Sequence, residues 1–170
     1  RLEIARAAIE KGYEVHVATT FTDHASTIRD NGLILHKLQM SRSGSKIIGN
    51  LKTFIEIVKI FRKVNPKLVH LVTIKPVILG GIAARFTKIH GVIAAVSGLG
   101  SAFLDNGIFG KIKRFFIKRL YRISLRNLNI QVIWQNPNDI EVIQKFSILS
   151  LANYSLIEGS GVSLTKFTFS

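Results

Sequence analysis

The stretch LVHLVTIKPVILGGIAARFTKIHGVIAAVSG, residues 68–98, predicts a strand, a helix and a second strand. Its ends, 68–73 and 91–98, are short apolar runs without polar alternation, which is typical of parallel strands covered on both faces. The middle, 77–88, is rich in Ala and Gly and follows Pro76, a residue suited to the start of a helix. Two parallel strands joined by a helix form the βαβ unit of α/β folds.

The same alternation continues outward in both directions. Helices are predicted over 1–11, 23–31, 48–64, 111–126 and 138–146, and further strands over 13–20, 33–38, 130–134 and 154–158. We therefore expect an α/β fold, a Rossmann-like, doubly wound parallel sheet. The first helix has no strand before it, so we expect the founding strand to be missing and the chain to be a piece of a longer protein.

Composition narrows the class of protein. The chain has 170 residues, 47% of them hydrophobic, with a mean hydropathy of +0.28, which excludes a disordered chain. Cysteine is absent, so a disulfide framework and a cysteine metal site are excluded. The net charge of +14 predicts a polyanionic partner, which can be nucleic acid, phosphate-bearing substrates or anionic lipid. No apolar stretch is long enough to predict a transmembrane span.

Candidate site residues follow from a rule for open parallel sheets, which bind ligands beyond the carboxyl ends of their strands. His70 lies within the strand 68–73, and Thr73 and Lys75 lie at its end. A lysine beside a helix N-terminus suits an anionic group such as phosphate. The alternatives are a core histidine bonded to a carbonyl and a solvated loop lysine.

Two further strand ends carry candidate binding residues. Gly98, Gly100 and Ser101 follow the strand 91–98, where glycines let a ligand approach the backbone or simply permit a turn. Gln135 and Asn136 follow the strand 130–134, and their amides could hydrogen-bond a polyhydroxylated ligand. Asn138 or Asp139 is expected to cap the next helix.

Several common sites find no support in the sequence. The glycines do not form the dinucleotide-binding G-x-G-x-x-G fingerprint, although the missing first turn is where it would lie, and no phosphate-binding G-x-x-x-x-G-K-[ST] motif occurs. The five histidines show no metal-ligand spacing. We expect neither a metal nor a cofactor.

The segment KIKRFFIKRLYRISLR, residues 111–126, carries seven cationic side chains and no acid. An apolar stripe recurs at helical spacing and is expected to pack inward; it consists of Phe109, Ile112, Phe116, Leu120 and Ile123. A cationic stripe lies opposite and consists of Lys111, Arg114, Lys118, Arg122 and Arg126. Phe115 and Leu125 fall among the cations, as an interfacial membrane helix requires. A solvated outer helix and a nucleic-acid contact are the alternatives.

Five ordered motifs resemble the N-terminal half of family 4 glycosyltransferases, in particular bacterial enzymes that build O-antigen, capsule or glycoprotein sugars on a polyprenyl-diphosphate carrier. They are RLEIARAAIEKGYEVHVAT (1–19), VHLVTIKPVILGGIAAR (69–85), AVSGLGSAF (95–103), WQNPND (134–139) and IEGSGVSLTKF (157–167). The resemblance implies one half of a GT-B fold, with 1–157 as the acceptor-side domain and 158–170 as the segment crossing to an absent donor domain.

The resemblance also implies an activity. It is transfer of a hexosyl or N-acetylhexosaminyl group, with retention of configuration, from a nucleotide-sugar to a lipid-linked glycan. His70 and Lys75 would act in catalysis on the cleft wall beside Thr73, with the two glycines below and Gln135 and Asn136 alongside. A lipid-carried acceptor implies a peripheral protein on the cytoplasmic face of the plasma membrane. The fragment alone is expected to be inactive.

Ser163 departs from the family pattern, because the family has Asp in the corresponding G-S-G-V-D motif, which puts an acidic role there in doubt. Two competing hypotheses come from other classes. The charge of +14 motivates a basic nucleic-acid-binding module, although no known binding motif is present. A nicotinamide-dependent enzyme would need the missing fingerprint.

Overall fold

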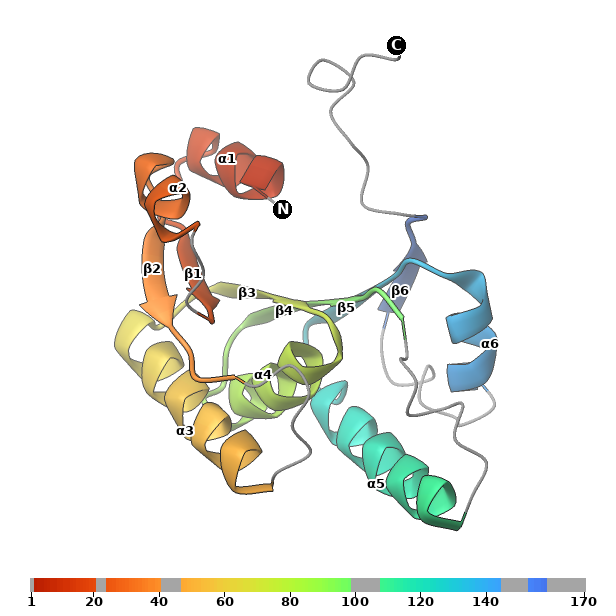
Figure 1. Cartoon of the computed structure of the whole chain (residues 1–170). Coiled ribbons are helices and arrows are strands. Elements are labelled where there is room, and N and C mark those ends of the chain that lie inside the picture. Colours follow the sequence, from red (N-terminus) through yellow and green to blue (C-terminus); the bar gives the residue numbers. More distant parts are fainter. Residues whose placement is uncertain (1, 21–23, 41–46, 99–107, 145–152, 159–170) are drawn as a thin grey trace. The chain divides into compact units, whose positions relative to one another are not determined.

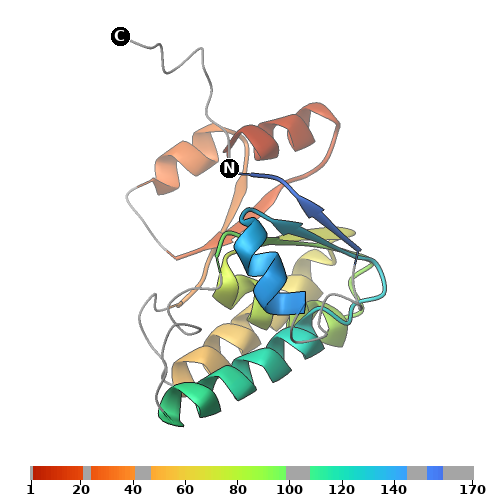
Figure 2. The same cartoon turned by 90° about the vertical axis from the view of Figure 1, so that its right-hand side faces the viewer.

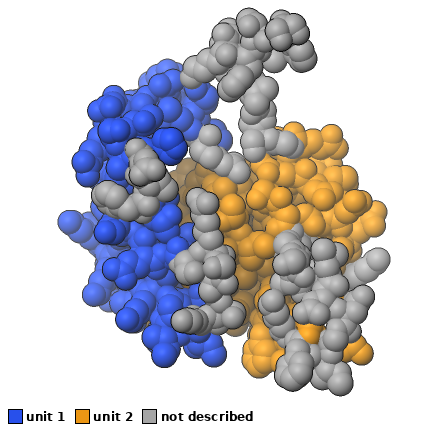
Figure 3. Space-filling view, viewed as in Figure 1, with its two compact units in different colours: residues 1–64 blue, residues 65–170 orange. Residues whose placement is uncertain are grey.

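The computed structural model describes residues 2–20, 24–40, 47–98, 108–144 and 153–158. They belong to two compact units, Arg1–Val64 and Asn65–Ser170, which are coloured separately in Figure 3. The expected crossing segment, 158–170, lies almost entirely outside the described residues.

The second unit is a four-stranded parallel sheet in the order β3-β4-β5-β6 (Figure 1). Its elements alternate along the chain as β3 (Leu68–Val72), α4 (Ile74–Phe86), β4 (Gly91–Val96), α5 (Ile108–Ser124), β5 (Ile130–Trp134), α6 (Pro137–Gln144) and β6 (Asn153–Leu156). Successive strands advance in one direction, so right-handed connections place all three helices on the same face of the sheet. The predicted α/β class with parallel strands is confirmed.

Helices α4 and α5 lie side by side on one face of this sheet (Figures 1 and 2), and small residues set how closely they approach. Gly80 and Gly81 are both buried in α4. A Cβ on Gly81 would clash with the Ser124 side chain of α5, and one on Gly80 would clash with Leu71 of β3. The Ser124 hydroxyl donates to the Val77 carbonyl at 2.6 Å. The helices are thus joined by close backbone approach and by a buried hydrogen bond.

Helix α4 begins earlier than the sequence predicts, at Ile74 rather than residue 77. Pro76 is the third residue of the helix. The first four N–H groups of a helix have no intrahelical partner, so proline costs no hydrogen bond there. Lys75 is therefore a residue of the first helical turn rather than of a loop.

The first unit consists of α1 (Leu2–Glu10), β1 (His16–Thr19), α2 (Ala25–Asp30), β2 (Ile34–Lys37) and α3 (Ile47–Val64). The β1 and β2 strands pair in parallel. Glycines in the left-handed conformation end the first two helices, because Gly12 follows α1 with a φ of 82° and Gly32 follows α2 with a φ of 74°. After α1, the N–H of Gly12 donates to the Ile9 carbonyl at 2.8 Å and that of Tyr13 to the Ala8 carbonyl at 3.1 Å, which closes the last turn.

A chain of three titratable side chains joins β1 to β2. His16 Nδ1 and His36 Nε2 are 2.8 Å apart, and His16 Nε2 lies 2.8 Å from Glu14 Oε1. A carboxylate only accepts, so His16 Nε2 carries a hydrogen, and in the neutral pair His36 Nε2 donates to His16 Nδ1. Burial, His16 and Lys63 lower the pKa of His36. A doubly protonated pair has no acceptor between the rings and loses this bond.

Acidification is therefore expected to destabilise the protein through His36. A histidine whose folded pKa lies below its ordinary 6.5 contributes stability that is present above that value and is lost as the pH falls through the folded pKa. Between pH 7.5 and 5, urea unfolding of the native chain should show a loss of unfolding free energy. In His36→Gln this loss should be smaller by about 1 kcal/mol, which is the contribution of one hydrogen bond. His90→Gln, an exposed control, should keep the native pH dependence. Equal pH dependence in all three proteins would contradict the assignment.

Candidate functional site at the strand ends

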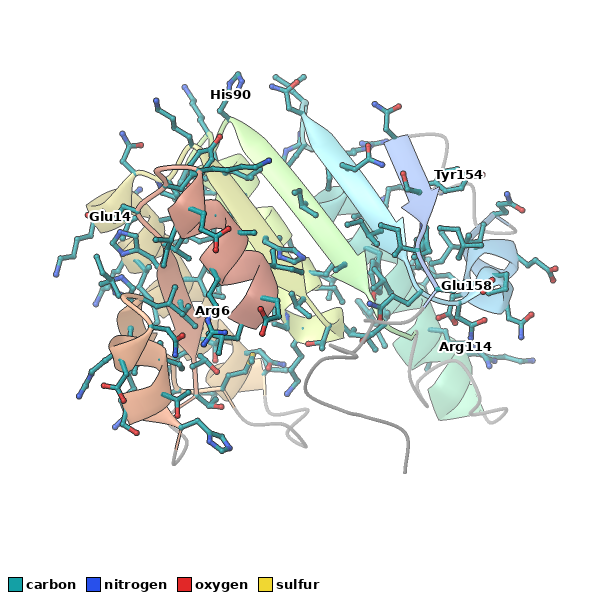
Figure 4. All side chains as sticks on the ribbon, turned by 90° about the horizontal axis from the view of Figure 1, so that it is seen from above. Arg6, Glu14, His90, Arg114, Tyr154 and Glu158 are labelled. Carbon is teal, nitrogen blue, oxygen red and sulfur yellow. The ribbon has the colours of Figure 1, made fainter. Side chains whose placement is uncertain are left out.

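Three backbone hydrogen bonds align the carboxyl ends of the four parallel strands. The N–H of Thr73 donates to the Ala95 carbonyl at 3.1 Å, that of Gln135 to the Val96 carbonyl at 3.3 Å and that of Ile157 to the Trp134 carbonyl at 2.8 Å. In Figure 4 this edge is the one that carries Glu158, and the opposite edge carries His90. The residues that follow β3, β4, β5 and β6 therefore form one row, as the sequence predicts.

Thr73 has a backbone conformation that threonine rarely adopts. Its φ is 72° and its ψ is 167°, a region that is populated almost only by glycine. Such strain costs about 1–3 kcal/mol and persists only where the surroundings enforce it. The Thr73 carbonyl accepts from the Val77 N–H at 3.0 Å, so this residue joins the end of β3 directly to α4. Strained residues of this kind concentrate at functional sites, and sequence patterns do not reveal them.

The two predicted catalytic residues lie at different places. Lys75 is in the first turn of α4, half-buried, where the helix N-terminus favours anions. His70 is in the middle of β3 on the exposed face of an alternating strand, between the buried residues Val69 and Leu71. It is therefore not a buried core histidine. Each of these two residues interacts with another group.

At the end of β5, Asn136 caps α6. Its Oδ1 accepts from the Asn138 N–H at 3.0 Å, and its carbonyl accepts from the Asp139 N–H at 3.2 Å. The prediction that Asn138 or Asp139 caps this helix is wrong, because Pro137 is already its first residue and leaves the capping position to Asn136. Gln135 is half-buried in the row of strand ends. Asn136 is therefore exposed and also caps a helix.

Of the predicted glycine-rich loop, only its first residues are described. Gly98 follows β4 with a φ of 148°, a conformation that side chains disfavour. Gly100 and Ser101 lie outside the described residues, and their predicted role stays a prediction. The structure thus brings Thr73, Lys75, Gly98, Gln135 and Asn136 to one edge of the sheet.

Comparisons with known proteins agree with this arrangement. The model of the family described as "Glycosyl transferase 4-like" matches residues 1–136. The chain belongs to this family. The match covers β1 to β5 and every described residue of the site. The predicted resemblance to family 4 glycosyltransferases is confirmed.

One curated relative and one solved structure are similar to this family member. The relative is N,N'-diacetylbacillosaminyl-diphospho-undecaprenol alpha-1,3-N-acetylgalactosaminyltransferase of Campylobacter jejuni, 28% identical over 167 residues, which are 98% of this chain and 44% of that protein. The chain thus spans less than half the length of this relative. The structure is MurG of Acinetobacter baumannii, with a TM-score of 0.49 and 14% identity over 97% of this chain and 63% of that one.

Within the part that the family model matches, α5 presents a different face than predicted. Its buried side chains are Tyr121 and Ser124, and Leu125 directly after it is buried as well. The predicted inward stripe instead faces solvent and includes Ile112, Phe116, Leu120 and Ile123. Two predictions are therefore wrong, the inward orientation of this stripe and the role of Leu125 as a membrane contact. The close approach to Gly81 selects Ser124 for the inner face, and this outweighs the larger apolar stripe.

The other predicted membrane residues differ in how deeply their side chains are buried. Phe115 is 65% exposed, and Lys111 is exposed as well. Arg114, Lys118 and Arg122 are half-buried at the border of the inner face. Burial and the neighbouring Arg114 lower the pKa of Lys118. The exposed face of α5 is therefore mainly apolar, with Arg119 exposed among its apolar side chains and further cations along its border.

Three buried polar atoms behind the strand ends were not predicted. They are the Tyr121 hydroxyl of α5, Nε1 of Trp134 at the end of β5 and Oδ2 of Asp139 in α6, and none has a hydrogen-bond partner within the described part of the chain. Burial and the charge of Asp139 raise the pKa of Tyr121. Only the three-dimensional packing of α5, β5 and α6 reveals these atoms, because their sequence positions give no periodic signal.

The described residues contain neither a metal-ligand cluster nor a membrane-spanning helix. Within them, no three His, Cys, Asp or Glu side chains gather as metal ligands would. None of their helices combines the length and apolar character that a membrane crossing requires.

Proposed function

We propose that the chain is the acceptor-side part of a retaining glycosyltransferase that transfers a sugar from a nucleotide-sugar to a polyprenyl-diphosphate-linked glycan. The observation that carries the proposal is the row of strand ends with Lys75 in the first turn of α4, in a chain of the glycosyl transferase 4-like family. The Campylobacter relative supports this acceptor class, because its name gives its substrate as a sugar on diphospho-undecaprenol.

The chemistry of the row suits such an acceptor. A diphosphate needs cationic and N–H donors, which Lys75 and the α4 N-terminus supply together. Sugar hydroxyls need donors and acceptors of the amide kind, which Gln135 and Asn136 supply at the end of β5, two strands away in the same row. We propose that Lys75 binds the acceptor diphosphate and that Thr73 holds the α4 N-terminus beside it. The donor nucleotide would be bound mainly by a second domain.

Binding of a water-soluble acceptor analogue tests this proposal. The probe is N-acetylglucosamine linked through diphosphate to a farnesyl chain, titrated calorimetrically into the chain without vesicles. Lys75→Ala should weaken binding roughly 10- to 100-fold, because a hydrogen bond to a charged group contributes about 1.5–3 kcal/mol. Lys88→Ala is the matched control, an exposed lysine just beyond the other end of α4, and should bind as the native chain does. Absence of binding by the native chain, or equal losses in both variants, would refute the proposal.

We also propose that the protein docks reversibly on the cytoplasmic face of an anionic membrane through the exposed face of α5. A lipid-carried acceptor keeps its diphosphate at the membrane surface, so its enzyme has to reach that surface. On α5, Ile112, Phe115 and Phe116 are each more than half exposed, and the helix contains no acid. Apolar side chains bordered by cations are the pattern of an interfacial helix. The Phe115 and Phe116 rings lie edge to face, with centroids 5.8 Å apart, and form one aromatic projection.

A further inference from the structure

The edge of the second unit's sheet at which its strands begin carries exposed cations beside exposed apolar side chains. The N–H of Gly91 donates to the Lys67 carbonyl at 3.0 Å and that of Val92 to the Asn129 carbonyl at 2.9 Å, so the starts of β3, β4 and β5 lie side by side. Figure 4 shows His90 at this edge. Helices α4 and α5 both end here, because each leads back to the start of the next strand. The exposed side chains form what we call the amino-edge patch, which consists of Lys67, Arg85, Phe86, Lys88, Arg126 and Leu128.

Hydrogen bonds hold this patch in place. The Nη1 group of Arg85 donates to the Arg126 carbonyl at 3.2 Å, which joins the end of α4 to the segment after α5. Asn127 is buried, and its side-chain amide donates to one carbonyl of α4 at 3.1 Å and to one of α5 at 2.6 Å. Its neighbour Leu128 is fully exposed, and Phe86 is 62% exposed. The two apolar side chains are therefore held outward by an ordered backbone.

Lys88 occupies a backbone position that glycine usually takes. Helix α4 ends in a Schellman motif, in which the N–H of Lys88 donates to the Arg85 carbonyl at 3.3 Å and that of Ile89 to the Ala84 carbonyl at 2.9 Å. The φ of Lys88 is accordingly 58°, whereas α1 and α2 place glycines at the corresponding position. Glycine adopts this conformation more easily than any residue with a side chain. A lysine at this position indicates that its side chain serves a purpose other than ending the helix.

The cations of the patch are not matched by acids in their own segments. The three segments that form it, 65–68, 85–90 and 126–129, contain no Asp or Glu. The acids of the second unit that the structure describes are Asp139, Glu141 and Glu158, and all of them come after β5 or β6 in the chain. A surface with one sign of charge attracts partners of the opposite sign and favours their association.

We propose that the amino-edge patch docks an acidic segment of a partner protein. Its arginines would bind carboxylates of the segment, and Phe86 and Leu128 would pack on an apolar side chain between those carboxylates. Arginine and aromatic side chains are enriched in protein interfaces and among the residues that dominate their affinity. Nucleic acid fits the patch less well, because Leu128 has no aromatic face on which a base could stack.

The proposal goes beyond the proposed function and does not depend on it. The patch lies at the edge where the strands begin, and Lys75 follows the opposite end of β3. Docking at the patch would therefore leave the row of strand ends open to the acceptor. The same separation means that variants of one surface can serve as controls for the other.

Fluorescence anisotropy with an acidic peptide tests the charged part of this surface. The probe is a fluorescein-labelled peptide of glutamate and aspartate with one phenylalanine and one leucine at its centre, titrated with the full chain. Arg85→Gln with Arg126→Gln should weaken binding about 10-fold, because two surface charge pairs are lost. Arg29→Gln with Arg119→Gln is the matched control, since it removes the same charge from two exposed arginines outside the patch and should keep nearly native affinity. Absence of binding by the native chain, or equal losses in both double variants, would overturn the proposal.

A double-mutant cycle tests the apolar part. A second peptide carries serine in place of its phenylalanine and leucine. Phe86→Ser with Leu128→Ser should weaken binding of the first peptide about 10-fold and leave binding of the second unchanged, because only the first peptide can pack on these side chains. Both side chains are exposed, so circular dichroism and melting should stay native. Equal losses for the two peptides would contradict the proposed docking mode.

Lys88→Gly separates the binding role of this residue from its structural role. Glycine suits the φ of 58°, so the variant should melt at the native temperature or above it. It should nevertheless bind the first peptide about 3-fold more weakly, because one surface cation is lost. A Lys88→Gly chain that binds the peptide with native affinity would count against the proposal.

Other polyanions provide the last comparison. Labelled duplex DNA, duplex RNA and vesicles that contain phosphatidylglycerol are titrated in the same way. Tighter binding of any of them than of the peptide, with the same dependence on Arg85 and Arg126, would overturn the proposal in favour of that polyanion. The arginine variant should bind the farnesyl-diphosphate probe like the native chain, and Lys75→Ala should bind the peptide like the native chain. Failure of the acceptor proposal and failure of the docking proposal are thereby distinguishable.

Discussion

Replacing Gly81 by alanine is expected to lower the free energy of unfolding by about 2–4 kcal/mol, although alanine is the better helix former. The added Cβ would clash with the Ser124 hydroxyl and would lie 3.0 Å from the Ser124 carbonyl oxygen, a backbone atom that moves only with the whole of α5. Overpacking of this kind costs about 1–3 kcal/mol. Separation of the helices would also weaken the buried bonds from Ser124 to the Val77 carbonyl and from Asn127 to the Gly81 carbonyl, each worth about 1 kcal/mol.

Gly49→Ala is the matched control for this prediction, since it makes the same chemical change in the first turn of α3. No atom lies within 4 Å of a Cβ built on Gly49, so the substitution should raise stability by about 0.5–1 kcal/mol. Urea unfolding of both variants measures the two effects. Adding Ser124→Ala to Gly81→Ala should recover part of the loss, because the hydroxyl is removed but the carbonyl remains. A Gly81→Ala chain within 0.5 kcal/mol of the native one would contradict the assigned packing.

The packing of α4 on α5 also shows which features of the fold could be predicted from the sequence and which could not. The order of strands and helices follows from apolar runs, glycines and prolines, which act locally, and for that reason the glycine stops at Gly12 and Gly32 and the row of strand ends were predictable. The orientation of α5 depends on its partner. Hydrophobic periodicity assumes that the largest apolar stripe is buried, whereas a helix that packs on glycines buries its small residues.

The residues of the candidate site also divide into those that the sequence predicts and those that only the fold reveals. Lys75 and Gln135 were predictable because they follow strands, and the carboxyl ends of parallel strands share one edge. The strain at Thr73 was not predictable, because no local rule assigns a threonine to a glycine conformation. The pairing of His16 with His36 depends on the register of β1 with β2, which a single sequence does not specify. The Thr73 conformation and the pairing of His16 with His36 both depend on contacts between segments that are distant in the sequence.

Changing both Phe115 and Phe116 to serine is expected to weaken binding to anionic vesicles about 100-fold. Burial of one phenylalanine side chain contributes about 1.5–3 kcal/mol, so transfer of two rings partway into the headgroup layer amounts to about 3 kcal/mol. Both rings are exposed in the folded chain, at 65% and 60%, so their loss should leave the melting temperature almost unchanged. Co-sedimentation with vesicles that contain phosphatidylglycerol measures the effect. Phe86→Ser is the matched control, because Phe86 is 62% exposed on α4 and should be dispensable for binding.

Two further variants separate the contributions on and beside α5. Changing Lys111, Arg114, Lys118 and Arg122 to glutamine should weaken vesicle binding mainly at low salt, because attraction between surface cations and anionic lipid is screened at high ionic strength. Leu125→Ser should instead unfold the domain, because Leu125 is fully buried.

A gel shift with duplex DNA and RNA tests the remaining alternative, which is that α5 contacts nucleic acid. If the phenylalanine variant binds vesicles like the native chain, or if nucleic acid is bound tightly and vesicles are not, α5 is not a membrane contact and the charge of +14 has to be assigned to another polyanion.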